Sequence, residues 1–125
     1  MEITPLVPAG RQLIQTYGNG GFTIAGIHHV GSVLVFPEHT QTWPVSAIET
    51  VTRQHLQVVA DTGTEIDFLL LGAGIEVSFF RPELRLHLSD AGIAVEVMDT
   101  GAACRTFNVL LAEGRRIAAA LIAVK

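Results

Sequence analysis

The polar residues that could perform chemistry gather at the start of one predicted helix. Asp99, Thr100, Cys104, Arg105 and Asn108 follow an apolar run. Arg105 and Asn108 are three residues apart, so a helix places them on one face. Cys104 would lie near the first turn, where the helix dipole can lower the pKa of a thiol. A nucleophile also needs a base, and nothing local supplies one, so we favour a packed, unreactive thiol.

Two glycines, Gly72 and Gly74, follow another apolar run and suggest a dinucleotide-binding turn. That interpretation fails because the third glycine of the fingerprint would fall at Val77. Pro82 also places the start of the next helix too far downstream. We therefore favour a plain glycine-rich turn, with a small anion held by its backbone amides as the alternative.

A metal site is not indicated by the histidines, which are His28, His29, His39, His55 and His87. No two of them are four apart on a predicted helix, and no carboxylate or thiol falls at metal-ligand spacing. We expect loop and surface histidines, no metal and no cofactor.

A charged group marks the far end of the same helix. Glu113 would lie at its carboxyl end, where a negative charge is unfavourable, and Arg115 and Arg116 are close enough to compensate it. We favour a solvated helix face here, with a functional surface as the alternative. No catalytic residue is assigned. The candidate binding surface comprises Gly72, Gly74, Asp99, Thr100, Cys104, Arg105, Asn108, Glu113 and Arg115.

The elements that position these residues are clearest in the second half of the chain. Ile66–Leu71 and Ile93–Met98 are apolar runs of strand length, and the first suits a strand covered on both faces. Between them, Pro82–Ala91 has the start signal and apolar spacing of a helix, closed by Gly92. The sequence therefore predicts a parallel β-α-β unit over residues 66–98 with a right-handed crossover.

The following helix is predicted to begin at Asp99 or Thr100, both good N-caps, and to run to Glu113. Its expected buried stripe is Ala103, Phe107 and Leu110. After Gly114, Ile117–Val124 fits a helix or a strand by pattern, and we favour a strand because the run is short.

Additional β structure is predicted from the first half. Leu13–Tyr17 and Phe22–Ala25 flank a glycine-rich hairpin turn, and His28–Gly31 is expected to be a break. Ser32–Phe36 then forms a strand.

A loop is predicted for Glu38–Pro44, with Trp43 anchoring it to the core. A short helix follows with Thr52 as its N-cap, and Val51 and Leu56 can form a hydrophobic staple across the start.

Composition bounds the class of protein. The 125 residues suit one domain, residues 1–125, and 49% hydrophobic against 16% charged residues excludes disorder. A net charge of −4 argues against nucleic acid as a partner. A single cysteine suits a reducing compartment, and the longest apolar run is far below the roughly 20 residues of a membrane span. We expect a cytoplasmic protein without a transmembrane segment.

Several stretches together resemble one family of small domains. They are Leu70–Gly74, Pro82–Leu84, Gly92–Thr100, Ala103–Leu110 and Glu113–Arg116. The family includes the adipogenesis-associated Mth-domain protein and a mitochondrial complex I assembly factor. The resemblance implies a compact three-layer α/β fold, in which a mixed central sheet has helices on one side and extra β structure on the other.

The same resemblance implies no established enzyme activity and no cofactor, and it implies a role in assisting the assembly of a respiratory complex. Members usually have Tyr where Phe107 stands, so a mechanism that needs a phenol there is in doubt.

Three functions remain open. The first is a non-enzymatic interaction or assembly-assisting domain that binds a protein partner. The second is a small-molecule binder or cryptic enzyme with a site at the strand ends around Gly72, Asp99 and Arg105. The third is a structural subunit of a homo-oligomer. A concave pocket on which Arg105 and Asn108 converge would favour the second, and a flat apolar patch would favour a protein partner.

Overall fold

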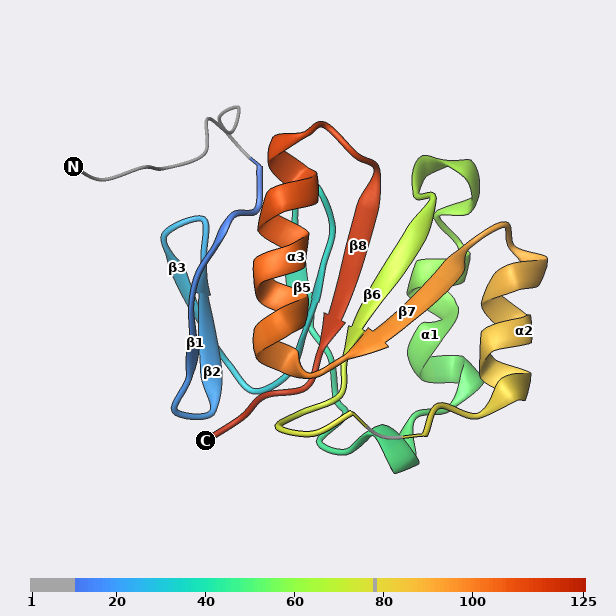
Figure 1. Cartoon of the computed structure of the whole chain (residues 1–125), viewed down its shortest axis with the longest axis horizontal. Helices are drawn as coiled ribbons and strands as arrows, with labels where there is room; N and C mark the ends of the chain where they lie inside the picture. Colours follow the sequence, from blue (N-terminus) through green and yellow to red (C-terminus); the bar gives the residue numbers. More distant parts are fainter. Residues whose placement is uncertain (1–10, 78) are drawn as a thin grey trace.

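A five-stranded mixed sheet forms the centre of the structure, a computed structural model that describes residues 11–77 and 79–125. Its strand order is β5-β4-β8-β6-β7. Figure 1 shows β8, β6 and β7 side by side, with β5 behind α3 (Thr100–Ala112). The strands are β4 (Val33–Val35), β5 (Thr40–Thr42), β6 (Phe68–Gly72), β7 (Ala94–Met98) and β8 (Ile117–Leu121). Strand β6 runs parallel to both β7 and β8, whereas β4 is antiparallel to both β5 and β8.

The predicted β-α-β unit is confirmed. Strands β6 and β7 pair in parallel from Phe68 opposite Ala94 to Gly72 opposite Met98. Helix α2 (Pro82–Asp90) connects them, and its proline occupies the first turn, where no backbone hydrogen bond is lost. The continuous apolar run of β6 follows from its position, because the sheet covers its edges and other elements cover both of its faces.

Strand β8 resolves the ambiguity of the last apolar run in favour of a strand. All five of its residues are buried, and it lies between β4 and β6 in the sheet. Small side chains at Ala118, Ala119 and Ala120 allow other elements to pack closely on both faces there.

A second sheet of three strands comes from the first half of the chain, with β1 (Ile14–Gly18), β2 (Gly21–Ile24) and β3 (Ile27–Val30) in that order. The predicted β1–β2 hairpin is confirmed. Its turn uses Asn19 and Gly20 at φ of 53° and 78°, the conformation that an Asn-Gly turn favours.

The break predicted at His28–Gly31 is wrong, because β3 occupies most of it and pairs antiparallel with β2. The break lies instead at Ala25 and Gly26, which both have positive φ. Strand β3 was missed because it is an edge strand whose largely exposed residues, including two histidines, do not alternate in polarity.

The loop predicted over Glu38–Pro44 also contains a strand, since β5 pairs antiparallel with β4. Its sequence is polar throughout because the strand lies at the edge of the sheet and none of its residues is buried. The anchoring role of Trp43 is confirmed. Its ring is buried, and its Nε1 donates a hydrogen bond to the carbonyl of His55 at 2.9 Å.

Helix α1 (Arg53–Ala60) begins as predicted after its N-cap, Thr52. The Thr52 hydroxyl accepts a hydrogen bond from the amide of His55 at 3.3 Å, and Nδ1 of the His55 ring accepts one from the amide of Thr52 at 3.0 Å. Val51 and Leu56 are both fully buried across this start, as the staple requires. Two short 3-10 turns, Ile48–Thr50 and Gly63–Glu65, flank the helix.

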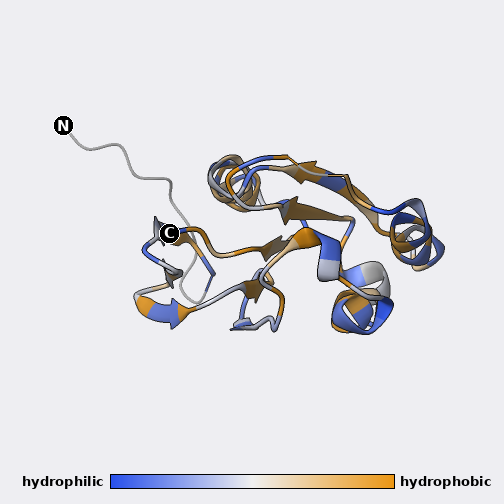
Figure 2. Ribbon diagram, turned by 90° about the horizontal axis from the view of Figure 1, so that it is seen from below, coloured by the Kyte–Doolittle hydropathy of each residue, from blue (hydrophilic) through white to orange (hydrophobic). Residues whose placement is uncertain are grey.

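Two apolar clusters lie on opposite faces of the main sheet, because alternate residues of its strands point to opposite sides. Leu69 and Leu71 of β6 pack in the cluster that α1 and α2 cover. Leu70 points the other way, into the cluster shared by α3 (Thr100–Ala112) and the small sheet. Figure 2 shows hydrophobic residues concentrated in the central strands between these layers.

The predicted α/β class, with a mixed sheet and added β structure from the first half, is confirmed. Helices α1 and α2 lie on one side as expected, and α3 shares the other side with the small sheet. In α3, Ala103 and Phe107 are buried as predicted, but Leu110 is only partly buried and Leu111 takes the buried position. Leu111 is four residues after Phe107, as Phe107 is four residues after Ala103, and this spacing keeps all three side chains on one face of a helix with 3.6 residues per turn.

Candidate functional site

Thr100 joins three elements at the carboxyl ends of the central strands. Its hydroxyl donates to the carbonyl of Ile122 at 2.7 Å and accepts from the amide of Gly74 at 3.0 Å. Its own amide donates to the carbonyl of Gly74 at 2.8 Å. The side chain is fully buried, so these bonds are made without competition from water. Thr100 thus fastens the start of α3 to the residues that follow β6 and β8.

Asp99 and the two glycines serve the same junction. The Asp99 carboxylate accepts from the amide of Ala102 at 2.9 Å and caps α3. A Cβ on Gly72 would lie 3.0 Å from the Cα of Thr100 and 3.0 Å from Cδ2 of Leu121. Gly72 therefore permits a close approach of backbones, and Gly74, at φ of 103°, provides the turn. These positions support the plain glycine-rich turn.

Cys104 lies in the apolar cluster between α3 and the sheet. Burial raises the pKa of its thiol from 9.0 to about 12, with Arg105 lowering and Asp99 raising that pKa by smaller amounts. The thiol is therefore protonated at neutral pH, and the helix dipole does not activate it. This environment supports the interpretation of Cys104 as a packed thiol.

Asn108 binds the protein's own backbone. Its Oδ1 accepts from the amide of Ile14 at 2.8 Å, and its Nδ2 donates to the carbonyl of Ile14, also at 2.8 Å. The carboxamide thus makes the same pair of hydrogen bonds that a residue of a neighbouring strand would make, and it connects β1 to α3. Both ends of this side chain are engaged in the fold.

Arg105 remains exposed on α3, and its Nη1 donates to the hydroxyl of Tyr17 at 3.4 Å. Tyr17 was not among the candidate residues. It packs over the first turn of α3, where a Cβ on Gly101 would lie only 2.5 Å from its hydroxyl oxygen. No local pattern could have paired Arg105 with Tyr17, because they are 88 positions apart.

Glu113 and Arg115 lie away from the other candidate residues, at the opposite end of α3. A helix of 13 residues is about 20 Å long, so one surface cannot include both ends within a small-molecule site. Arg115 lies over the ring of Phe68 at 5.7 Å, and Arg116 forms an ion pair with Asp67 at 2.8 Å. The arginines expected to compensate Glu113 thus contact β6 and the residue before it.

A groove of about 510 Å³ opens at the carboxyl ends of β6 and β8. Of the predicted surface residues, all of which the structure describes, Gly74 alone lines it. The lining is Ser46, Ala47, Ile48, Glu49, Ala73, Gly74, Ile75, Ile122, Ala123, Val124 and Lys125. Arg105 and Asn108 do not converge on this groove, and its walls are largely apolar.

Three large apolar side chains that follow the carboxyl end of β6 are exposed, and sequence reasoning missed them; the first of them, Ile75, also lines the groove. Ile75, Val77 and Phe79 are 82%, 62% and 75% exposed, in the connection between β6 and α2. The available signal was a set of alternating apolar residues that belongs to neither predicted element. We call these three residues the apolar trio.

Within residues 11–77 and 79–125, no three His, Cys, Asp or Glu side chains are grouped so that they could hold a metal ion. No helix in that part of the chain has the length and apolar character needed to cross a bilayer.

Comparison with known proteins places the chain in a family. The family described as "Protein of unknown function (DUF498/DUF598)" matches residues 14–122, so the chain belongs to it. The chain is 37% identical over 109 residues to NADH dehydrogenase [ubiquinone] 1 alpha subcomplex assembly factor 3 of Xenopus tropicalis. That match covers 87% of this chain and 60% of the frog protein, so the chain spans about three fifths of that relative. An uncharacterized protein of Rhodobacter capsulatus is 35% identical, with 91% and 86% covered.

Solved structures agree with this assignment. A Bartonella henselae protein described as an outer membrane protein is 40% identical, with a TM-score of 0.87 over 93% of this chain and 98% of that one. A Mth938-like domain of Bordetella pertussis is 27% identical, with a TM-score of 0.83 over 98% and 92%. The resemblance to the Mth-domain family is therefore confirmed.

Proposed function

We propose that this protein is a non-enzymatic interaction domain that assists the assembly of a multisubunit complex. The respiratory NADH dehydrogenase is the first candidate for that complex, because relatives from several animals are named as its assembly factors. A net charge of −4 favours a protein over a nucleic acid as the partner.

One observation carries the proposal: the polar groups at the strand ends are used to hold the fold together. Asn108 binds the backbone of Ile14, Thr100 binds that of Ile122, and Asp99 caps α3. A catalytic site needs polar groups that are oriented toward a substrate and available to it. The buried, protonated thiol of Cys104 does not meet that need either.

Deletion of the gene in its own organism tests this proposal. We expect subassemblies of NADH dehydrogenase to accumulate on native gels and the assembled enzyme to decrease, with restoration by the wild-type gene. A tagged chain should capture subunits of the same complex. Normal assembly in the deletion strain, together with capture of none of these subunits, would refute the proposal.

A small-molecule binder or cryptic enzyme around Gly72, Asp99 and Arg105 is the second candidate. It is favoured by the exposed guanidinium of Arg105 beside the hydroxyl of Tyr17, a pair of donors at the surface. Arg105→Ala would distinguish the candidates. The second requires this variant to lose binding of a small molecule found by thermal-shift screening, whereas the first requires no such ligand.

The remaining proposals concern the state of the protein. We propose that residues 1–125 form one domain. A homo-oligomer of this domain is a further option, and light scattering can determine its oligomeric state. We also propose a cytoplasmic location, supported by a single cysteine, which suits a reducing compartment. Because the 40%-identical Bartonella henselae protein is described as an outer membrane protein, cell fractionation is the deciding measurement.

A further inference from the structure

The apolar trio is held in place by the residues on either side of it. Before it, the amide and carbonyl of Gly74 both bond to Thr100. After it, Phe80 is buried, and the guanidinium of Arg81 donates to the carbonyl of Val51. The chain is thus anchored immediately before Ile75 and immediately after Phe79. These anchors fix both ends of the short segment that carries the trio, and its three apolar side chains are exposed between them.

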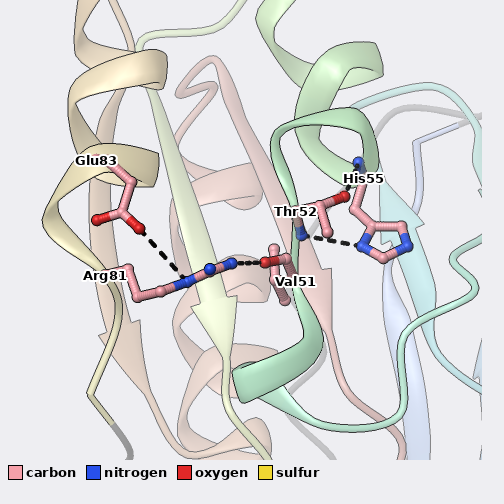
Figure 3. A network of polar contacts seen from close by, with 5 residues as sticks. All are labelled: Val51, Thr52, His55, Arg81 and Glu83. Carbon is pink, nitrogen blue, oxygen red and sulfur yellow. Dashed lines mark hydrogen bonds and ion pairs between the residues drawn. The ribbon is translucent and has the colours of Figure 1, made fainter.

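Figure 3 shows the anchor at Arg81, whose guanidinium reaches both Glu83 and the carbonyl of Val51. Glu83 lies 3.8 Å from Nε of Arg81, and Val51 directly precedes the Thr52 cap of α1. The short turn Ile48–Thr50, which ends just before Val51, supplies Ile48 and Glu49 to the groove, and Ile75 lines the same groove. Ile75 therefore belongs to both the trio and the groove, and Val77 and Phe79 follow it within four residues of the chain.

The charges of this surface indicate what it can bind. Glu76, between two members of the trio, and Glu49, at the groove, are both exposed carboxylates. Lys125 is the one cation among the lining residues, and beside the trio the charge of Arg81 is opposed by Glu83 at 3.8 Å. A bilayer with anionic lipids would be repelled by the carboxylates. An apolar segment with basic residues beside it would satisfy both the apolar surface and the carboxylates.

We propose that the apolar trio and the adjoining groove bind an apolar segment of a partner protein that carries basic residues beside it. This proposal rests on the proposed function and names the chemistry of the partner. Soluble proteins rarely leave large apolar side chains exposed next to one another. Where they do, the exposed apolar surface is typical of a binding site. Apolar contact supplies affinity, and the carboxylates select the partner.

Two synthetic peptides provide the test. Both contain the same eight-residue core of leucine, valine and phenylalanine, with two lysines at each end of one peptide and two glutamates at each end of the other. Fluorescence anisotropy should show saturable binding of the lysine peptide, about tenfold tighter than binding of the glutamate peptide. The double variant Val77→Ser and Phe79→Ser should weaken binding of the lysine peptide at least about tenfold. Glu49→Gln with Glu76→Gln should reduce the preference between the peptides.

A matched control carries Leu86→Ser and Val109→Ser, which replace side chains of similar exposure, 60% and 56%, on α2 and α3. This control should bind as the wild type does, and circular dichroism should show that all variants fold. Equal binding of the two peptides, equal losses in the control, or no saturable binding would overturn the proposal. So would tighter binding to vesicles of phosphatidylcholine and phosphatidylglycerol, or a dimer that the Val77→Ser and Phe79→Ser variant abolishes.

The proposal about this surface can fail separately from the proposed function. If the wild-type gene restores complex assembly and the Val77→Ser and Phe79→Ser gene restores it equally well, the surface is wrong and the function stands. If deletion of the gene leaves assembly unchanged while the lysine peptide binds as expected, the surface stands and the assembly role fails.

Discussion

The start of α3 and the connection between β6 and α2 lie side by side, yet their side chains point in opposite directions. At α3, Thr100 and Asn108 are polar and turn inward to bond with the backbone. In the connection, Ile75, Val77 and Phe79 are apolar and face solvent. Residue types alone favour the polar side chains of α3 as the binding surface and the apolar side chains of the connection as part of the core. The comparison shows that satisfied hydrogen bonds and exposure decide which surface is available to a partner.

The largest expected effect concerns the inward-facing side of α3. Phe107→Ala should lower the free energy of unfolding by about 3–5 kcal/mol, because it removes a fully buried ring from the core. Val109→Ala on the exposed side should change it by about 0.5 kcal/mol or less. Urea unfolding measures both. Similar values for the two variants would contradict the assignment of faces.

Asn108→Ala tests whether the polar side chain is structural. It should lower the free energy of unfolding by about 1–3 kcal/mol, because the amide and carbonyl of Ile14 lose their partner. Arg105→Ala, on the same helix but exposed, should stay within about 0.5 kcal/mol. A silent Asn108→Ala, again by urea unfolding, would return Asn108 to the candidate binding surface.

Two glycines at the same junction should respond differently to alanine. Gly72→Ala should cost about 1–3 kcal/mol, because its Cβ would press on the Cα of Thr100, which cannot move independently of the backbone. Gly101→Ala should cost less, because the obstructing atoms belong to the half-exposed side chain of Tyr17, and alanine favours the helix. Thermal midpoints of the two variants give the order, and the reverse order would be evidence against the described packing.

A further effect, confined to alkaline pH, concerns Cys104. Because burial raises the pKa of the folded thiol to about 12, the unfolded chain releases this proton first as the pH rises above 9.0. Stability that is fully present below pH 9 should therefore decline toward pH 12, by at most about 1.4 kcal/mol per pH unit. Cys104→Ala should remove this component of the decline. Equal alkaline slopes for wild type and variant would show that the thiol is not buried in this way.

The thiol also permits a kinetic check of the same feature. Modification of folded Cys104 by a thiol reagent at neutral pH should be slower than modification of the unfolded chain, because the thiolate is scarce and access is blocked. A faster reaction in the folded protein would revive the enzyme hypothesis.

The sequence predicted most of the central fold because its signals are local. The apolar run of β6, the proline of α2 and the cap at Thr52 each identify an element from a few adjacent residues. Strands β3 and β5 were missed because edge strands bury few residues and so show no apolar alternation.

The site was less predictable because its partners are distant in sequence. Asn108 is 94 positions from Ile14, and Arg105 is 88 positions from Tyr17. Nothing near Asn108 in the sequence indicates that its carboxamide will face a strand. The exposure of Phe79 next to a buried Phe80 likewise depends on tertiary packing rather than on residue type.

The position of β8 has a consequence for how the chain folds during its synthesis on the ribosome. Strands β4 and β6 are synthesised before β8. They do not pair with each other, because β8 lies between them and pairs with both. Until residues 117–121 emerge, these two strands expose unpaired edges and apolar faces. The central sheet therefore closes only after β8 has been synthesised, and a chain that lacked β8 would leave both edges open to pairing with other chains.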